Sequence, residues 1–288
     1  MTRPSDFSFT HRLRVRWMEV DAQQVVFNGH YLTYLDVGIS EYWRAVGLPY
    51  PEGIKHEQGD IFVRRNTLEY HAPARLDDWL DIGVRCERIG NSSITIAWAI
   101  WAQGRLLVTG ETVYVHTSLL TGKSSPVPAS VRQQIESHAQ GAPVHRVVCG
   151  AWRDMADAAR AVRIAVFVNE QGIDEAEEWD DDDAGAVHAV ACNLAGLPLA
   201  TGRLIHLGQE SGHAKIGRMA VLRSTRGIGL GDQVLKALMD EARSRGIQHL
   251  SLNAQVSAQA FYARQGFKPQ GEVFDEVAIP HQRMTLTL

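Results

Sequence analysis

Cysteine is scarce in this sequence. Its 288 residues include only Cys86, Cys149 and Cys192, and no two of them form a CxxC pair. This spacing argues against a disulfide framework or a cysteine-based zinc site and favours a reducing compartment. No apolar run approaches the roughly 20 residues of a membrane-spanning helix, and the N-terminus lacks the apolar core of a signal peptide. We therefore expect a cytoplasmic protein without a membrane segment.

Strong charge of either sign is also missing. The 29 Lys and Arg residues nearly balance the 33 Asp and Glu residues, and the net charge is -4. Without a basic patch or a polybasic run, neither nucleic acid nor an anionic membrane is an expected partner. No cluster of His, Cys and acidic residues has the spacing of metal ligands, so no metal is expected.

The length and the distribution of turn residues indicate two domains. A chain of 288 residues is long for one domain. Residues 118–145 hold five Gly and Pro residues around a short helical piece at 130–138, which is typical of a connector. We predict one domain over residues 1–140 and a second over residues 146–288.

The first half reads as one long helix followed by an antiparallel sheet. Alternating residues predict a strand at 9–17. Helical spacing predicts a helix from Tyr31 to Val46 with Asn28 as its N-cap. Its apolar face comprises Tyr31, Leu32, Leu35, Ile39, Tyr42, Trp43 and Val46. Four strand-like runs follow, at about 60–70, 79–90, 93–102 and 105–117. Tight-turn residues between the last three predict a meander, giving an α+β fold whose sheet wraps the helix.

The second half alternates strands and helices. Helices are expected at about 151–168, 229–245 and 256–264. Strands are expected at about 186–194, 198–207, 214–222, 248–253 and 282–287.

A carboxylate stands seven residues before the first helix. Asp21 can lie beside the amides of Asn28 and Gly29, which the start of a helix leaves unpaired. Those amides can polarise a thioester carbonyl while the acid attacks it or deprotonates a water molecule. Asp is also common in turns, so Asp21 alone does not distinguish a catalytic residue from a turn residue.

The surrounding residues carry a family resemblance. Residues 15–31, and the stretch Tyr70-His71-Ala72-Pro73-Ala74, resemble the 4-hydroxybenzoyl-CoA thioesterase family over about residues 8–138. The resemblance implies a hotdog fold, hydrolysis of acyl-CoA, and a homodimer or homotetramer. It places Asp21 as nucleophile or general base and the Asn28–Gly29 backbone as oxyanion donor. One branch of the family has His at the position of Asn28, so catalysis assisted by His is in doubt here.

A glycine-rich loop opens the long helix of the second half. Arg226, Gly227, Gly229 and Gly231 follow a strand-like run, and small residues there let helix amides approach a pyrophosphate. A dinucleotide site fits poorly, because the loop comes late in the domain and no repeated parallel βαβ units follow.

This loop resembles the Arg/Gln-x-x-Gly-x-Gly signature of GNAT acetyltransferases, and further matches extend over about 148–288. The resemblance implies binding of acetyl-CoA, with the backbone of Met219 and Val221 pairing with pantetheine. It implies that Asn253 and Tyr262 flank the thioester and that Tyr262 reprotonates the leaving thiolate. The acceptor is an amine of unknown identity.

The base for that amine is less well specified by the sequence. Glu170 and His281 are the two candidates, and either can be structural instead. The acidic run at 180–183 either attracts a cationic amine or is a solvated loop.

Two functions of different classes follow. Either both halves are catalytic, which makes the chain a bifunctional coenzyme A thioester enzyme, or the second half is a non-catalytic acetyl-CoA-binding module that regulates the thioesterase. Tyr262 favours the first, because a sensor needs no acid for a thiolate. A hydratase is the weakest alternative, because no Asp-x-x-x-x-His dyad follows a strand.

Overall fold

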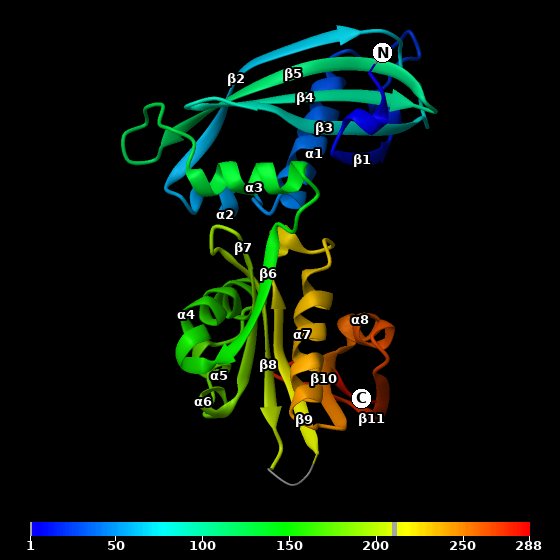
Figure 1. Cartoon of the computed structure of the whole chain (residues 1–288). Coiled ribbons are helices and arrows are strands. Elements are labelled where there is room, and N and C mark those ends of the chain that lie inside the picture. Colours follow the sequence, from blue (N-terminus) through cyan, green and yellow to red (C-terminus); the bar gives the residue numbers. More distant parts are fainter. Residues whose placement is uncertain (1, 209–211) are drawn as a thin grey trace. The chain divides into compact units, whose positions relative to one another are not determined.

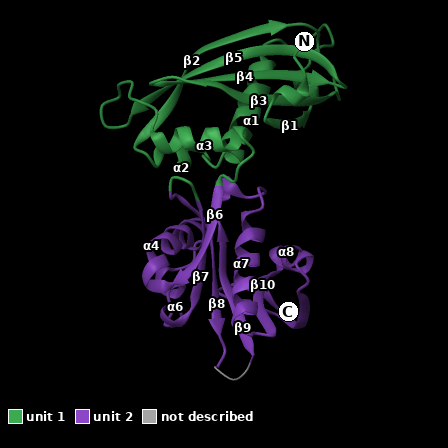
Figure 2. Ribbon diagram, viewed as in Figure 1, with its two compact units in different colours: residues 1–144, 193–195 green, residues 145–192, 196–288 purple. Residues whose placement is uncertain are grey.

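The computed structural model describes residues 2–208 and 212–288 (Figure 1). The chain separates into two compact units, which Figure 2 shows in different colours. Unit 1 comprises residues 1–144 and 193–195, and unit 2 comprises residues 145–192 and 196–288. Among the described residues, no helix is long and apolar enough to cross a membrane.

Unit 1 contains an antiparallel sheet with the strand order β1-β3-β4-β5-β2. The strands are β1 (Phe9–Arg14), β2 (Gly59–Tyr70), β3 (Trp79–Ile89), β4 (Ser93–Ala102) and β5 (Arg105–Ser118). The predicted meander of the last three strands is therefore confirmed. The helices are α1 (His30–Ala45), α2 (Glu52–Lys55) and α3 (Ala129–Ala139), with 3-10 turns at Pro4–Asp6 and Trp17–Glu19.

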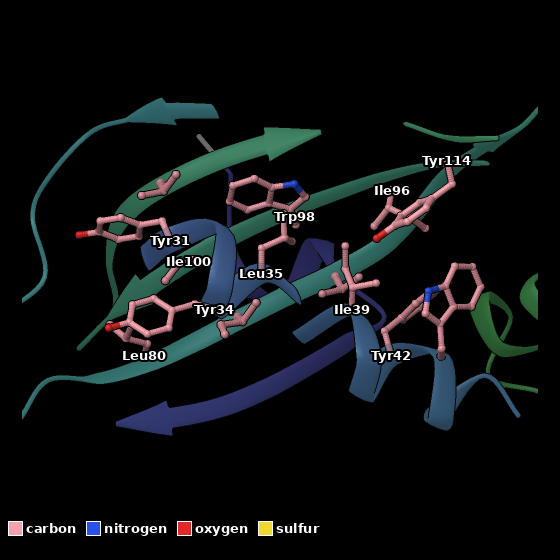
Figure 3. Close-up of a cluster of buried hydrophobic side chains, with 14 of the residues drawn as sticks. Tyr31, Tyr34, Leu35, Ile39, Tyr42, Leu80, Ile96, Trp98, Ile100 and Tyr114 are labelled. Atoms are coloured by element: carbon pink, nitrogen blue, oxygen red, sulfur yellow. The ribbon is translucent and has the colours of Figure 1, made fainter. Parts of the chain in front are cut away.

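Helix α1 packs along the inner face of this sheet (Figure 3). Its buried side chains recur at helical spacing and meet the alternate buried residues of β4, such as Ile96, Trp98 and Ile100. Gly38 permits the close approach, because a Cβ there would lie 2.6 Å from Ile82 Cγ2. The sheet thus curves around an apolar helix, as expected for a hotdog fold.

Two details of this helix differ from the sequence prediction. Leu32 is 39% exposed, whereas Tyr34 is buried and contributes to the core instead. Asn28 is not the N-cap: Gly29 occupies that position, and no described side chain caps the helix. With no side-chain cap, the backbone supplies the acceptor for the first helix amide, since His30 N–H donates to the Phe27 carbonyl at 2.9 Å.

Unit 2 contains a mixed sheet with the strand order β11-β12-β10-β9-β8-β7-β6. The strands are β6 (His145–Ala151), β7 (Val187–Asn193), β8 (Pro198–His206), β9 (His213–Val221), β10 (His249–Gln255), β11 (Lys268–Glu276) and β12 (Ile279–Thr287). β9 and β10 are parallel, and β6 and β11 were not predicted.

Two longer helices pack on strand β8 of this sheet, α4 (Trp152–Arg163) and α7 (Leu230–Ser244). The shorter helices are α5 (Glu175–Glu178), α6 (Asp182–Gly185) and α8 (Gln259–Arg264), with 3-10 turns at Arg223–Thr225 and Val256–Ala258. The predicted helix at 151–168 ends as α4 at Arg163 and continues as a π-helical segment, Ile164–Glu170. Such π-helical segments are frequent at functional sites.

A buried ion network ties the acidic segment to the sheet. Arg163 is fully buried, and its guanidinium donates to Glu178 and, at 2.8 Å, to Asp183. Arg203 binds Asp180 and Asp183. Asp183 is buried and Asp180 is partly exposed, but neither is free for a substrate, because arginines already pair with both.

Candidate active sites

The loop before α1 folds into a tight turn at Asp21. Val20 and Val26 form an antiparallel bridge, and the Asp21 amide donates to the Val25 carbonyl at 2.9 Å. Asp21 Oδ1 accepts the Gln23 amide at 2.8 Å, whereas Oδ2 has no hydrogen-bond partner among the described residues. Asp21 therefore shapes a turn and still presents a free carboxylate oxygen.

A second carboxylate in the same loop, Glu19, is fully engaged. Its side chain is 2% exposed and accepts hydrogen bonds from Tyr34 Oη at 2.6 Å and from the amide and guanidinium of Arg16. Burial alone would raise the pKa of Glu19, but the hydrogen bonds from Tyr34 and Arg16 outweigh it and lower the pKa. Glu19 thus fixes the loop, and Asp21 is the carboxylate left for chemistry.

We expect Glu19→Gln to lower the free energy of unfolding by about 1–3 kcal/mol, since hydrogen bonds to a charged group are lost. Because the folded pKa of Glu19 is lowered, its contribution is present above the unfolded pKa of about 4.3 and is lost as pH falls below it. Thermal unfolding between pH 3 and 8 tests this. The variant should unfold at lower temperature near neutrality, and the difference should shrink in acid. If the difference in unfolding temperature between the wild type and Glu19→Gln stayed constant over this pH range, the negative charge assigned to Glu19 would be wrong.

Two amides immediately before α1 are unpaired beside a cavity. The backbone N–H groups of Asn28 and Gly29 donate to no other described residue. Tyr70 Oη donates to the Asn28 carbonyl at 3.1 Å, and Asn28 and Tyr70 line a cavity of about 300 Å³. Asp21 is not among the residues lining this cavity in the single chain. The two parts of the predicted site, Asp21 and Asn28, each lie within two residues of the antiparallel bridge between Val20 and Val26.

In unit 2, a cavity of about 710 Å³ lies where two parallel strands stop pairing. The register of β9 and β10 covers only three residue pairs and ends at Ser251 with Lys215. Met219 and Val221 lie beyond that point and line the cavity together with the glycine loop. The divergence leaves room for an extended ligand between the strands.

The glycine loop is held in shape by both backbone and side chains. Gly227 and Gly229 have φ values of +90° and +85°, which lie in the region that glycine tolerates best. Arg226 binds both carboxylate oxygens of Glu170 at 2.7 Å and donates to the Val221 carbonyl. These hydrogen bonds lower the pKa of Glu170, so this carboxylate is a weak base and Arg226 is already paired.

Tyr262 stands at the junction of two cavities. It lines the 710 Å³ cavity and a second one of about 190 Å³, and its side chain is 8% exposed. Burial raises the pKa of Tyr262 to about 12, so the phenol is protonated at neutral pH. Its hydroxyl has no hydrogen-bond partner among the described residues. The residue that lines both cavities therefore carries a phenol that can donate a proton at neutral pH.

Asn253 and His281 lie on the side of the smaller cavity. His281 Nδ1 lies 2.8 Å from the Ile279 carbonyl, which can only accept a hydrogen bond. Nδ1 must therefore carry the proton, and in the neutral ring Nε2 holds the lone pair. Asn253 Nδ2 donates to Glu276 at 3.0 Å. Over residues 2–208 and 212–288, no three His, Cys, Asp or Glu side chains group so as to hold a metal ion.

Comparisons with known proteins match the two units separately. A family model described as "Thioesterase superfamily" matches residues 23–109, and one described as "Acetyltransferase (GNAT) domain" matches residues 166–288. The uncharacterized N-acetyltransferase YjcF of Bacillus subtilis is 35% identical over 124 residues, 43% of this chain and 86% of that protein. The chain therefore belongs to the GNAT acetyltransferases, and its residues 23–109 are similar to the thioesterase superfamily. The acyl-CoA thioester hydrolase YbgC of Escherichia coli O157:H7 is 29% identical over 124 residues, 43% of this chain and 92% of that protein.

A solved structure is also similar to the GNAT domain. The putative N-acetyltransferase from Lactobacillus plantarum is 31% identical, with a TM-score of 0.47. The match covers 51% of this chain and 99% of that one.

The structure brings most of the predicted GNAT residues together. Met219, Val221, the glycine loop and Tyr262 line one cavity, and Asn253 and His281 line the adjoining one. Glu170 is in neither lining and is bound by Arg226 instead. Sequence reasoning missed Glu276, which contacts Asn253, because no motif marks it. It also missed Glu19 in the thioesterase domain, although a Glu three residues after Arg16 was visible.

Proposed function

We propose that the protein is a bifunctional coenzyme A thioester enzyme. The thioesterase domain hydrolyses acyl-CoA, and the GNAT domain transfers the acetyl group of acetyl-CoA to an amine. Both domains are present. For hydrolysis, support comes from the unpaired Asn28 and Gly29 amides together with the free oxygen of Asp21. For transfer, it comes from Tyr262 between two cavities.

In the thioesterase domain, the thioester carbonyl accepts hydrogen bonds from the amides of Asn28 and Gly29. These amides lie at the positive end of the α1 dipole and stabilise negative charge as it develops on the oxygen. Asp21 then acts in one of two ways. It attacks the carbonyl carbon and forms an anhydride that water cleaves, or it takes a proton from the water that attacks. Both routes release a free acid and coenzyme A.

In the GNAT domain, acetyl-CoA occupies the larger cavity, with its pyrophosphate at the start of α7 and its pantetheine along Met219 and Val221. The amine enters the smaller cavity as an ammonium ion and loses one proton to His281 Nε2. The neutral amine attacks the acetyl carbon, a C–N bond forms and the C–S bond breaks. Tyr262 protonates the leaving thiolate, and the second proton lost by the amine returns to tyrosine through solvent. The products are an N-acetyl amine, coenzyme A and one proton.

The proposal includes a homodimer or homotetramer formed through the thioesterase domain, in the cytoplasm. Near Asp21, Trp17 and Met18 are 82% and 72% exposed, and β2 presents Phe62 and Val63 at an edge of the sheet. Exposed apolar side chains on an edge strand, which leaves one row of backbone groups unpaired, are typical of an interface between copies.

The alternative, in which the GNAT domain only senses acetyl-CoA, is less well supported. A sensor needs the cavity that holds acetyl-CoA, but it needs neither a second cavity nor a proton donor between the two. The cavity beside Tyr262, His281 and Asn253 therefore favours catalysis.

Thiol release separates the two activities. We expect the wild type to release thiol from members of an acyl-CoA chain-length series without an amine, which reports hydrolysis. In an Asp21→Asn background, thiol release from acetyl-CoA should depend on a primary amine from a broad panel, with the acetylated amine confirmed by mass spectrometry. Thiol release in neither assay would reject the bifunctional enzyme. Hydrolysis without any amine-dependent release would leave the sensor alternative.

A further inference from the structure

The smaller cavity of the GNAT domain is lined by several charged side chains, and half of the six Lys, Arg and Glu residues already have ion-pair partners. Arg203 binds Asp180 and Asp183. Arg218 and Arg163 bind Glu178. Arg203, Arg218 and Glu178 line the cavity, and because these pairs neutralise their charges, they offer a ligand no unpaired charge. A ligand is instead recognised by the charges that the protein leaves unpaired.

Glu276 is one of those charges. Among the described residues, no Lys, Arg or His forms an ion pair with it, and its one hydrogen bond is from Asn253 Nδ2. Asn253 thus holds one carboxylate oxygen, Oε2, and the other, Oε1, has no hydrogen-bond partner among the described residues. Glu177 and Lys215 also line the cavity without an ion pair to a described residue, but neither has a side-chain hydrogen bond that fixes its position there.

The register of the β11–β12 hairpin places Glu276 beside His281. Glu276 pairs with Ile279 and Phe274 pairs with His281, so these four side chains share one face of the hairpin. Glu276 and His281 are diagonal neighbours, about 7–8 Å apart at their Cα atoms. One ammonium group can therefore contact the Glu276 carboxylate and His281 Nε2 together.

The turn that carries these residues has an unfavourable backbone. Val277 and Ala278 both have positive φ, +51° and +57°, in a two-residue hairpin loop that normally uses Asn and Gly. A β-branched residue in this conformation is an outlier, and such outliers concentrate at ligand sites. Val277 also lines the cavity. The turn keeps Glu276 and Ile279 opposite each other while Val277 forms part of the wall.

We propose that Glu276 is the carboxylate that binds the acceptor, and that the acceptor is a small primary amine which enters as its ammonium ion. This inference rests on the proposed acetyltransferase function. Glu276 holds the ammonium beside His281, which takes one proton from it, and the neutral amine then attacks the acetyl group. A cavity of about 190 Å³ with apolar walls at Ile173, Ile205 and Ile279 suits a compact alkyl amine.

The test compares three proteins: wild type, Glu276→Gln and Glu272→Gln. In Glu276→Gln, the oxygen of the new side-chain amide can still accept from Asn253, so the fold is kept while the charge is lost. Glu272 lies on the same strand, is exposed and is outside the cavity, which makes it a matched control. The acceptor is the best substrate from a panel of putrescine, cadaverine, lysine, phenylethylamine and butylamine, each assayed by amine-dependent thiol release from acetyl-CoA with all three proteins in the Asp21→Asn background.

We expect Glu276→Gln to raise the KM for the amine at least about tenfold, the scale for a hydrogen bond to a charged group. The affinity for acetyl-CoA, measured by calorimetry, should stay within about twofold. Glu272→Gln should match the wild type. A merely structural role for Glu276 would weaken acetyl-CoA binding as well, and an unchanged KM would overturn the assignment. If the wild type acetylates no amine, the proposed acetyltransferase function is wrong. If the wild type and Glu276→Gln transfer the acetyl group equally well, only the assignment of Glu276 is wrong.

Discussion

Asp21→Asn should reduce acyl-CoA hydrolysis by about 10²–10⁴-fold, the scale for loss of a general base. The amide is nearly the same size as the carboxylate and can still accept the Gln23 amide through its oxygen, so the turn should persist. It cannot remove a proton from water and is a poor nucleophile. Thiol release from the best acyl-CoA of the chain-length series measures the loss, and thermal unfolding checks the fold.

The control for this variant is Asp36→Asn, on the exposed side of α1 in the same domain. We expect Asp36→Asn to hydrolyse acyl-CoA at the wild-type rate. Glu19→Gln provides a contrast, because it should lose stability, whereas Asp21→Asn should lose turnover. Near-wild-type hydrolysis by Asp21→Asn would leave Asp21 as a turn residue only, and the catalytic carboxylate would have to be sought elsewhere.

Periodicity predicted most of the fold because most of its elements have one buried face. The strands β2 to β5 and the helix α1 lie within about one residue of the expected ranges. Strand β11 was missed because nearly all of its residues are exposed, so it shows no apolar alternation. Its connection to β12 was missed as well, since Val277 and Ala278 are not turn-forming residues in sequence terms.

The predicted site residues also differ in whether a local sequence pattern is enough to reveal their surroundings. The glycine loop and Tyr262 belong to local patterns, and the structure places them around one cavity. Glu170 stands in such a pattern too, but its ion pair is with Arg226, 56 residues away, and no local pattern reveals it. Glu276 reaches the site only through the register of two strands. Pairing partners distant in the sequence therefore decided which candidates are free to act.

Tyr262→Phe should preserve acetyl-CoA binding and slow acetyl transfer by about 10²–10⁴-fold. The phenol hydroxyl makes no hydrogen bond to any residue that the structure describes, and the ring packs against Phe261 and Phe267. Phenylalanine keeps that packing, so only the proton donor is lost. Calorimetry with acetyl-CoA and amine-dependent thiol release, both in the Asp21→Asn background, measure the two quantities separately.

Gly229→Val is the complementary variant. Gly229 adopts φ +85° at the start of α7, which a β-branched residue adopts only under strain, although no described neighbour would clash with a Cβ there. The loop must then rearrange, so acetyl-CoA binding should weaken while hydrolysis by the thioesterase domain stays unchanged. If the GNAT domain is a catalyst, Tyr262→Phe should slow transfer without weakening acetyl-CoA binding, whereas Gly229→Val should weaken the binding itself. A sensor predicts that Tyr262→Phe changes neither acetyl-CoA binding nor hydrolysis and that no amine is acetylated by either the wild type or the variant. That outcome would reduce the GNAT domain to a coenzyme A-binding module.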